Sequence, residues 1–148
     1  MILGAHAIIG GVVGEASGNP LPAFIIGFLL HYVLDAIPHF DSFENGKIYT
    51  TKQIIFTVSE FTLGMIYIFF VLRPTLSISS PFLWGSIGCM LPDMLDYFPL
   101  WSRQWRGTKI GHSLSTFHRR IHSKNDPTLV QGILIQLAII AFFIFAFR

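Results

Sequence analysis

The chain has 148 residues, of which 52% are hydrophobic and only 12% are charged, and 15 of them are phenylalanine. Soluble domains carry roughly 25% charged residues, so this composition excludes an ordinary water-soluble protein. The length allows one domain over residues 1–148, and so small a core cannot hide all of the apolar stretches. We therefore expect one membrane-embedded helical domain. The single cysteine, Cys89, excludes an intrachain disulfide.

Five apolar windows follow one another along the chain. The first, residues 2–16, is short and rich in Gly and Ala, and we interpret it as a short span or a re-entrant helix, because small residues let helices approach closely. The other four each approach the roughly 20 residues that cross ~30 Å of hydrocarbon. They cover residues 21–38, 54–72, 82–100 and 129–147. We expect an all-α integral membrane bundle of four to five short transmembrane helices.

The connection over residues 101–126 is basic. It holds six of the ten Lys and Arg residues, which assigns it to the cytoplasm by the positive-inside bias: Arg103, Arg106, Lys109, Arg119, Arg120 and Lys124. Within it, residues 113–122 place Leu114, Phe117 and Ile121 at helical spacing. We expect a cytoplasmic surface helix there, lying on the bundle as a lid.

Several ionisable residues interrupt the apolar windows. They are His6, Glu15, His31, Asp35, Glu60, Asp93 and Asp96. Such groups each cost about 2.5–3.5 kcal/mol at membrane depth and usually mark function. Counted from the cytoplasmic ends at ~1.5 Å per residue, all but Glu15 fall in one shallow layer. We expect a common site at that level.

Two of the windows share a short sequence pattern that indicates an internal repeat. Ile26-Gly27, Leu34-Asp35 and Pro38 recur 61 residues later as Ile87-Gly88, Leu95-Asp96 and Pro99. One span lies between the two copies, so the two helices would run in parallel. A true repeat would place Asp35 and Asp96 at the same end of the bundle.

Three pairs of these side chains have spacings that place both members on one helix face. His31 and Asp35 are four residues apart, Asp93 and Asp96 are three apart, and His118 and His122 in the surface helix are again four apart. Neutral imidazole with carboxylate suits Zn²⁺, Mn²⁺ or Fe²⁺, and the groups suffice for one ion or for two ions that share a carboxylate. We expect a divalent metal, zinc or manganese, with a ligand set drawn from His6, His31, Asp35, Asp93, Asp96, His118 and His122.

Other polar residues have simpler interpretations. His39, Asp41 and His112 read as helix caps or interfacial residues. Glu60 is either a ligand or an acceptor for a neighbouring helix. Arg119 and Arg120 either meet lipid headgroups or clamp a substrate phosphate through bidentate hydrogen bonds.

These motifs resemble those of the small membrane-bound metal-dependent hydrolases of bacteria and archaea, also called LexA-binding, inner membrane-associated hydrolases. The resemblance lies in three stretches: Gly4-Ala5-His6-Ala7-Ile8-Ile9-Gly10, Leu91-Pro92-Asp93-Met94-Leu95-Asp96 and His118-Arg119-Arg120-Ile121-His122-Ser123. Two departures are visible. Tyr97 stands where that family has a histidine after Asp96, and the last motif is one residue shorter between its histidines. His31 and Asp35 also look like the helical His-x-x-x-Asp pair of zinc-dependent phospholipase C.

The resemblance implies a metal-dependent hydrolase of the prokaryotic plasma (inner) membrane, with its site facing the cytoplasm. We expect it to cleave a phosphoester or related bond of a membrane-associated substrate, with Asp93, His118, Arg119 and Arg120 as catalytic residues. Membrane lipids are the expected partners, and no nucleic acid is expected. One alternative is a metal-ion or proton-coupled transporter, which would need polar groups toward the opposite face, where we find only Glu15. The other is a non-catalytic scaffold subunit.

Overall fold

The computed structural model describes residues 3–39, 79–98, 100–122 and 127–147, together with 51, 54, 55, 58, 59, 62 and 66. Across these residues the regular structure is helical and no strand occurs, which confirms the all-α prediction. The helices with described bounds are α1 (Leu3–Ala16), α2 (Pro20–Asp35), α4 (Ser80–Tyr97), α5 (Ser102–Gly107), α6 (Lys109–Ile121) and α7 (Leu129–Ala146). Most of the predicted span over residues 54–72, including Glu60, lies outside the described residues.

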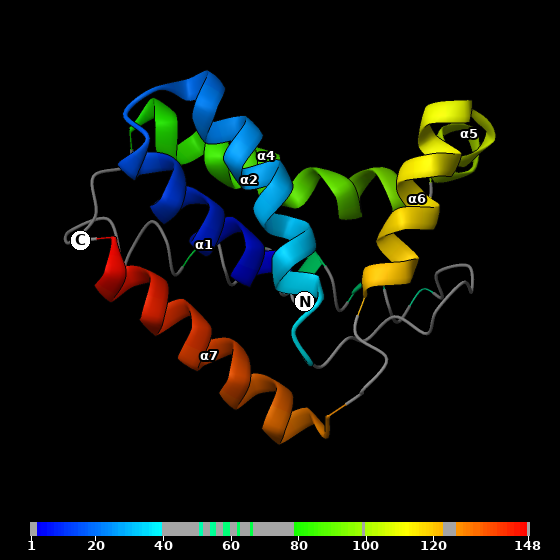
Figure 1. The fold of residues 1–148 in the computed structure, drawn as a ribbon. Coiled ribbons are helices and arrows are strands. Elements are labelled where there is room, and N and C mark those ends of the chain that lie inside the picture. The colour runs from blue at the N-terminus through cyan, green and yellow to red at the C-terminus, as the bar shows by residue number, and fades with distance from the viewer. Residues whose placement is uncertain are drawn as a thin grey trace.

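Helices α1, α2 and α4 form the centre of the molecule, where each contacts the other two. Figure 1 shows α2 and α4 running toward the same end, with α1 antiparallel to them. Helix α6 contacts both α2 and α4 near that end, and α7 packs against α1. The predicted surface helix is therefore present as α6, and it meets the bundle where α2 and α4 finish.

Polar residues at the helix starts explain where two of these helices begin. The Asn19 side chain accepts a hydrogen bond from the Leu21 main-chain N–H at 3.1 Å, and Pro20 occupies the first helical position. Thr128 and Gln131 form a reciprocal capping box at the start of α7. These contacts satisfy main-chain donors that have no partner within the helix.

Glycines allow the three central helices to touch backbone to backbone. A Cβ atom at Gly85 would overlap the carbonyl oxygen of Gly10, and one at Gly27 would overlap the carbonyl oxygen of Gly85. A Cβ atom at Gly88 would overlap the carbonyl oxygen of Phe24. Such close approach is the reason for small residues at helix interfaces in membranes. It brings the side chains at the ends of α1, α2 and α4 within reach of one another.

One helix of the described part of the chain, α7, is long and apolar enough to cross a membrane. Its mean hydropathy is 2.5, and 11% of it is buried. Helices α1 and α2 are apolar but shorter. The 16 residues of α2 reach about 24 Å at 1.5 Å per residue, which is less than the usual hydrocarbon thickness.

Replacing Gly85 with alanine should lower the free energy of unfolding by about 1–3 kcal/mol, because the new methyl group forces α1 and α4 apart. Thermal unfolding in detergent would measure the change. Gly107→Ala is the matched control, since a Cβ atom there has nothing within 4 Å. Equal unfolding temperatures for the two variants would contradict the close contact.

Candidate metal site

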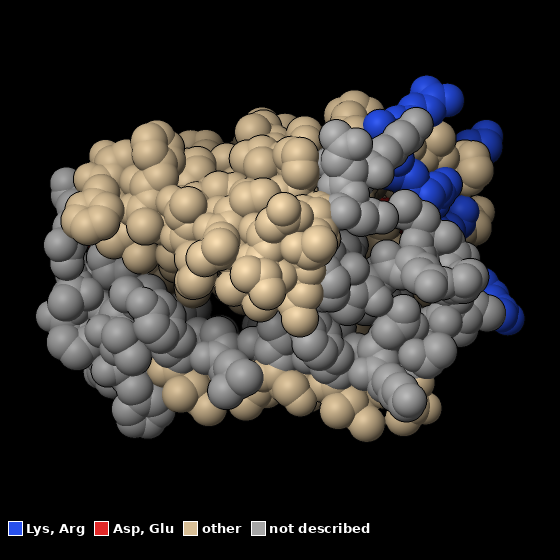
Figure 2. All heavy atoms as spheres, turned by 90° about the horizontal axis from the view of Figure 1, so that it is seen from below, with Lys and Arg blue, Asp and Glu red and all other residues tan. Residues whose placement is uncertain are grey.

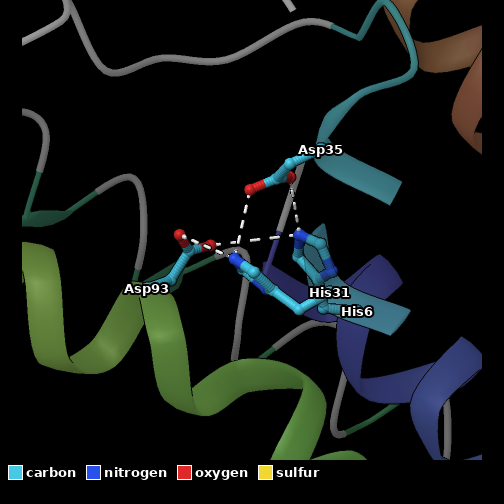
Figure 3. Close-up of side chains that lie close together, drawn as sticks. All are labelled: His6, His31, Asp35 and Asp93. Atoms are coloured by element: carbon cyan, nitrogen blue, oxygen red, sulfur yellow. Dashed lines mark hydrogen bonds and ion pairs between the residues drawn. The ribbon is translucent and has the colours of Figure 1, made fainter. Parts of the chain in front are cut away.

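Three helices deliver four ligating side chains to one point. His6 comes from α1, His31 and Asp35 from α2, and Asp93 from α4, and each offers a ligand atom within 4.8 Å of the others. The side chains point toward one another in Figure 3. His6, His31 and Asp35 are fully buried, whereas 19% of the Asp93 side chain is exposed. The group is therefore closed on most sides and reached at Asp93.

The distances between these atoms suit a single small ion. His31 Nε2 lies 3.1 Å from Asp35 Oδ2 and 3.6 Å from Asp93 Oδ1. His6 Nε2 lies 3.1 Å from Asp35 Oδ1 and 4.0 Å from Asp93 Oδ2. Two ligands of one tetrahedral Zn²⁺, each at about 2.0–2.1 Å, are separated by about 3.3 Å. The two imidazole rings stack with centroids 4.3 Å apart, and the Nε2 atoms of both face Asp35.

His118 joins this group from α6. Its Nε2 lies 2.8 Å from Asp35 Oδ2, 3.7 Å from Asp93 Oδ1 and 3.2 Å from Nε2 of His31. Two imidazole nitrogens this close cannot both present lone pairs without a proton or a cation between them. The surface helix therefore contributes directly to the centre.

Outer hydrogen bonds set the orientation of two of the imidazoles. His31 Nδ1 donates to the carbonyl oxygen of Cys89 at 2.8 Å, and His118 Nδ1 donates to Asp96 Oδ2 at 3.0 Å. Asp96 Oδ1 in turn accepts from the Ser115 hydroxyl. Because Nδ1 carries the proton in each ring, Nε2 is the atom presented to the centre, as in known metal sites.

The predicted site residues therefore divide into three sets. His6, His31, Asp35, Asp93 and His118 come together at the centre. Asp96 lies behind His118 rather than in the central group, although its spacing from Asp93 predicted a shared ion. His122 lies beside Asp35 and His39 in a second group. Arg119 and Arg120 are exposed on α6, and Arg119 Nη2 donates to Thr116 Oγ1 at 3.3 Å.

The sequence predicts a cap or an interfacial role for His39, but its side chain is buried and its ligand atom lies within 4.8 Å of one on Asp35. The signal for it was present in the sequence. His31, Asp35 and His39 follow one another at intervals of four residues, although α2 ends at Asp35. No expectation from the sequence covers Ser115, which precedes His118 by three residues on the same face of α6.

Two carboxylates favour the protonated form of His118. Burial by itself would lower the pKa of His118, but its hydrogen bonds to Asp35 and Asp96 outweigh burial and raise that pKa to about 10. The imidazolium lies between the two carboxylates. A divalent ion would have to displace this proton.

A basic surface accompanies the site. All five Lys and Arg residues of the described part of the chain belong to α5 and α6: Arg103, Arg106, Lys109, Arg119 and Arg120. On the face shown in Figure 2, these charges gather at one end of the molecule. The end that carries His118 is therefore the end that attracts anions.

No protein-family model matches the sequence, and no curated protein and no solved structure gives a match. Family membership is therefore not shown, and the resemblance to membrane-bound hydrolases stays an expectation.

Metal binding should strengthen as the pH rises, because an ion must displace the proton that His118 holds up to about pH 10. Release of one proton per ion predicts an apparent affinity that rises about tenfold per pH unit between about pH 6.5 and pH 8. Calorimetric titration in buffers of different ionisation enthalpy would count the released proton. The dependence should flatten in His118→Ala, and a wild-type affinity that ignores pH would contradict this role of His118.

Proposed function

We propose that this chain is a membrane-bound, metal-dependent hydrolase that cleaves a phosphoester or related bond of a membrane-associated substrate. The observation that carries the proposal is the convergence of the ligand atoms of His6, His31, Asp35 and Asp93 within 4.8 Å, with the first three of these residues buried. Burial of this many ionisable groups is unfavourable unless a cation or protons compensate them. In the chemistry of metalloenzymes, this donor set suits Zn²⁺ or Mn²⁺.

The residues of the chain would both bind the ion and transfer the proton. His6, His31, Asp35, Asp93 and His118 would hold the ion, which when bound supplies a Lewis acid and lowers the pKa of a coordinated water. Asp93, at 19% exposure, forms the edge that substrate and water reach first. Its carboxylate would also accept the proton that the attacking water loses.

The outer surface supports a place in the bilayer. Large apolar side chains stand outward on α2 and α7, including Leu21 at 67% exposure, Phe142 at 64% and Phe145 at 75%. His6, His31, Asp35, His39, Asp96 and His118 are buried instead, which reverses the usual arrangement in water. Lipid around these helices would remove the apolar surface from water. We assign the protein to the prokaryotic plasma (inner) membrane, with the basic α5–α6 end on the cytoplasmic side.

The charge beside the site favours an anionic substrate. Helices α5 and α6 carry five Lys and Arg residues in the described part of the chain, and Asp93 is the partly exposed member of the central group. A phosphoester on a lipid would approach from the membrane surface, where these side chains can meet its charge. Arg119 and Arg120 are the nearest in sequence to His118, a predicted ligand.

Purified protein should retain a divalent ion and hydrolyse lipid phosphates, and Asp93→Asn should lower kcat/KM by at least about hundredfold, because the amide removes a ligand charge but keeps the side-chain size. Phosphate release from phosphatidic acid in detergent micelles would measure turnover, and elemental analysis would measure metal.

His112→Ala is the matched control, since His112 is exposed on the same helix as His118. It should retain both metal and activity. Protein that retains no ion after exposure to Zn²⁺ and Mn²⁺ would contradict the proposal. Retained metal without hydrolysis, but with ion flux in proteoliposomes, would identify a transporter instead.

The double substitution Arg119→Ala with Arg120→Ala should raise KM for an anionic lipid by roughly tenfold while kcat changes little, since these residues would add binding energy outside the reacting centre. The same substitution should leave KM for an uncharged ester nearly unchanged. Steady-state kinetics on the two substrates would separate the effects. An unchanged KM for the anionic lipid would assign the arginines to topology alone.

A further inference from the structure

A second group of ligating side chains adjoins the first. Asp35, His39 and His122 each offer a ligand atom within 4.8 Å of the others. The rings of His39 and His122 lie with centroids 4.8 Å apart and planes at 72°. His39 comes just after α2 and is 2% exposed, while His122 is the C-cap of α6. Two segments far apart in sequence therefore bring two imidazoles to one carboxylate.

Asp35 is common to both groups, and its two oxygens face different imidazoles. Oδ2 lies 3.1 Å from His31 Nε2 and 2.8 Å from His118 Nε2. Oδ1 lies 3.1 Å from His6 Nε2 and 4.0 Å from His39 Nε2. His6 belongs to the first group and His39 to the second, so Oδ1 faces imidazoles of both groups. Asp35 therefore lies between the two groups, where a carboxylate that bridges two ions would lie.

The orientation of His39 matches that of the predicted ligands of the first group. Its Nδ1 donates to the carbonyl oxygen of Ile37 at 2.7 Å, so Nε2 is the ring atom turned toward Asp35. His31 has the same arrangement, with Nδ1 on the carbonyl oxygen of Cys89. A main-chain acceptor on Nδ1 is the usual way in which proteins aim Nε2 at a metal.

We propose that the two groups together bind two divalent ions, with His39 and His122 holding the second and the Asp35 carboxylate bridging both. The proposal deepens the hydrolase proposed above, since it adds an ion to the same site. Paired ions about 3.5–4 Å apart can stabilise the attacking and the leaving oxygen of an in-line displacement at phosphorus. Two carboxylates, Asp35 and Asp93, would not neutralise two divalent ions, and the remaining positive charge favours an anionic phosphoester over a neutral ester.

The number of bound ions is the direct test. Full-length protein in detergent, stripped of metal, loaded with Mn²⁺ and dialysed, should retain about two ions per chain by elemental analysis. Its electron paramagnetic resonance spectrum should show exchange coupling rather than the hyperfine pattern of isolated Mn²⁺. Retention of a single ion with an uncoupled spectrum would overturn the second site and leave the first in place.

Single histidine substitutions locate the second ion. His39→Ala and His122→Ala should each reduce retention from about two ions to about one and abolish the coupling, whereas His112→Ala should retain both. Unchanged retention and coupling in both His39→Ala and His122→Ala would overturn the assignment. If either alanine variant loses its helical circular dichroism, His39→Gln or His122→Gln replaces it, and the wild-type spectrum decides independently of any variant.

Failure of this inference and failure of the proposed function have different signatures. Two coupled ions without hydrolysis of any phosphoester would overturn the hydrolase and leave the paired site. One ion with hydrolysis would do the reverse. No retained ion at all would overturn both.

Discussion

The buried carboxylate of Asp35 is the group on which the rest of the site depends. Four imidazoles, from His6, His31, His39 and His118, lie within 4.0 Å of its two oxygens. An uncompensated charge in such a place costs several kcal/mol, so the side chains around it must supply protons or share a cation. This requirement links α1, α2 and α6 at one point, and Asp93 extends it to α4.

That arrangement needs helices that approach more closely than ordinary side chains permit. The glycines of α1, α2 and α4 allow this close approach because main chain packs directly against main chain, as at Gly10 and Gly85. The exterior is apolar, because the helix faces without glycines and without site residues carry aliphatic and aromatic side chains. Each helix therefore uses one face for close packing, one end for the site and the remaining face for the apolar surface.

Periodicity and the energetic cost of buried charge predicted much of this architecture. The apolar windows anticipated α1, α2, α4 and α7, and counting residues from the helix ends brought His6, His31, Asp35 and Asp93 to one level. Helical spacing could not tell a ligand from its supporting residue. Asp96 and Asp93 are three residues apart, yet Asp96 contacts Nδ1 of His118 and Asp93 lies nearer to its Nε2. Which carboxylate faces which nitrogen depends on where α6 crosses α4. The four-residue spacing of His31 and Asp35 continues to His39, but His39 lies beyond the end of α2, so helical spacing alone does not place its side chain.

The lone Cys89 gives the position of α6 a further meaning. With one cysteine the chain cannot cross-link itself through a disulfide, and His118 of α6 contacts Asp35 of α2 and Asp96 of α4. An ion held between residues 6, 31, 35, 93 and 118 would act as a reversible cross-link of five positions spread over more than a hundred residues. The strength with which α6 binds to the other helices would then depend on the concentration of metal in the cell.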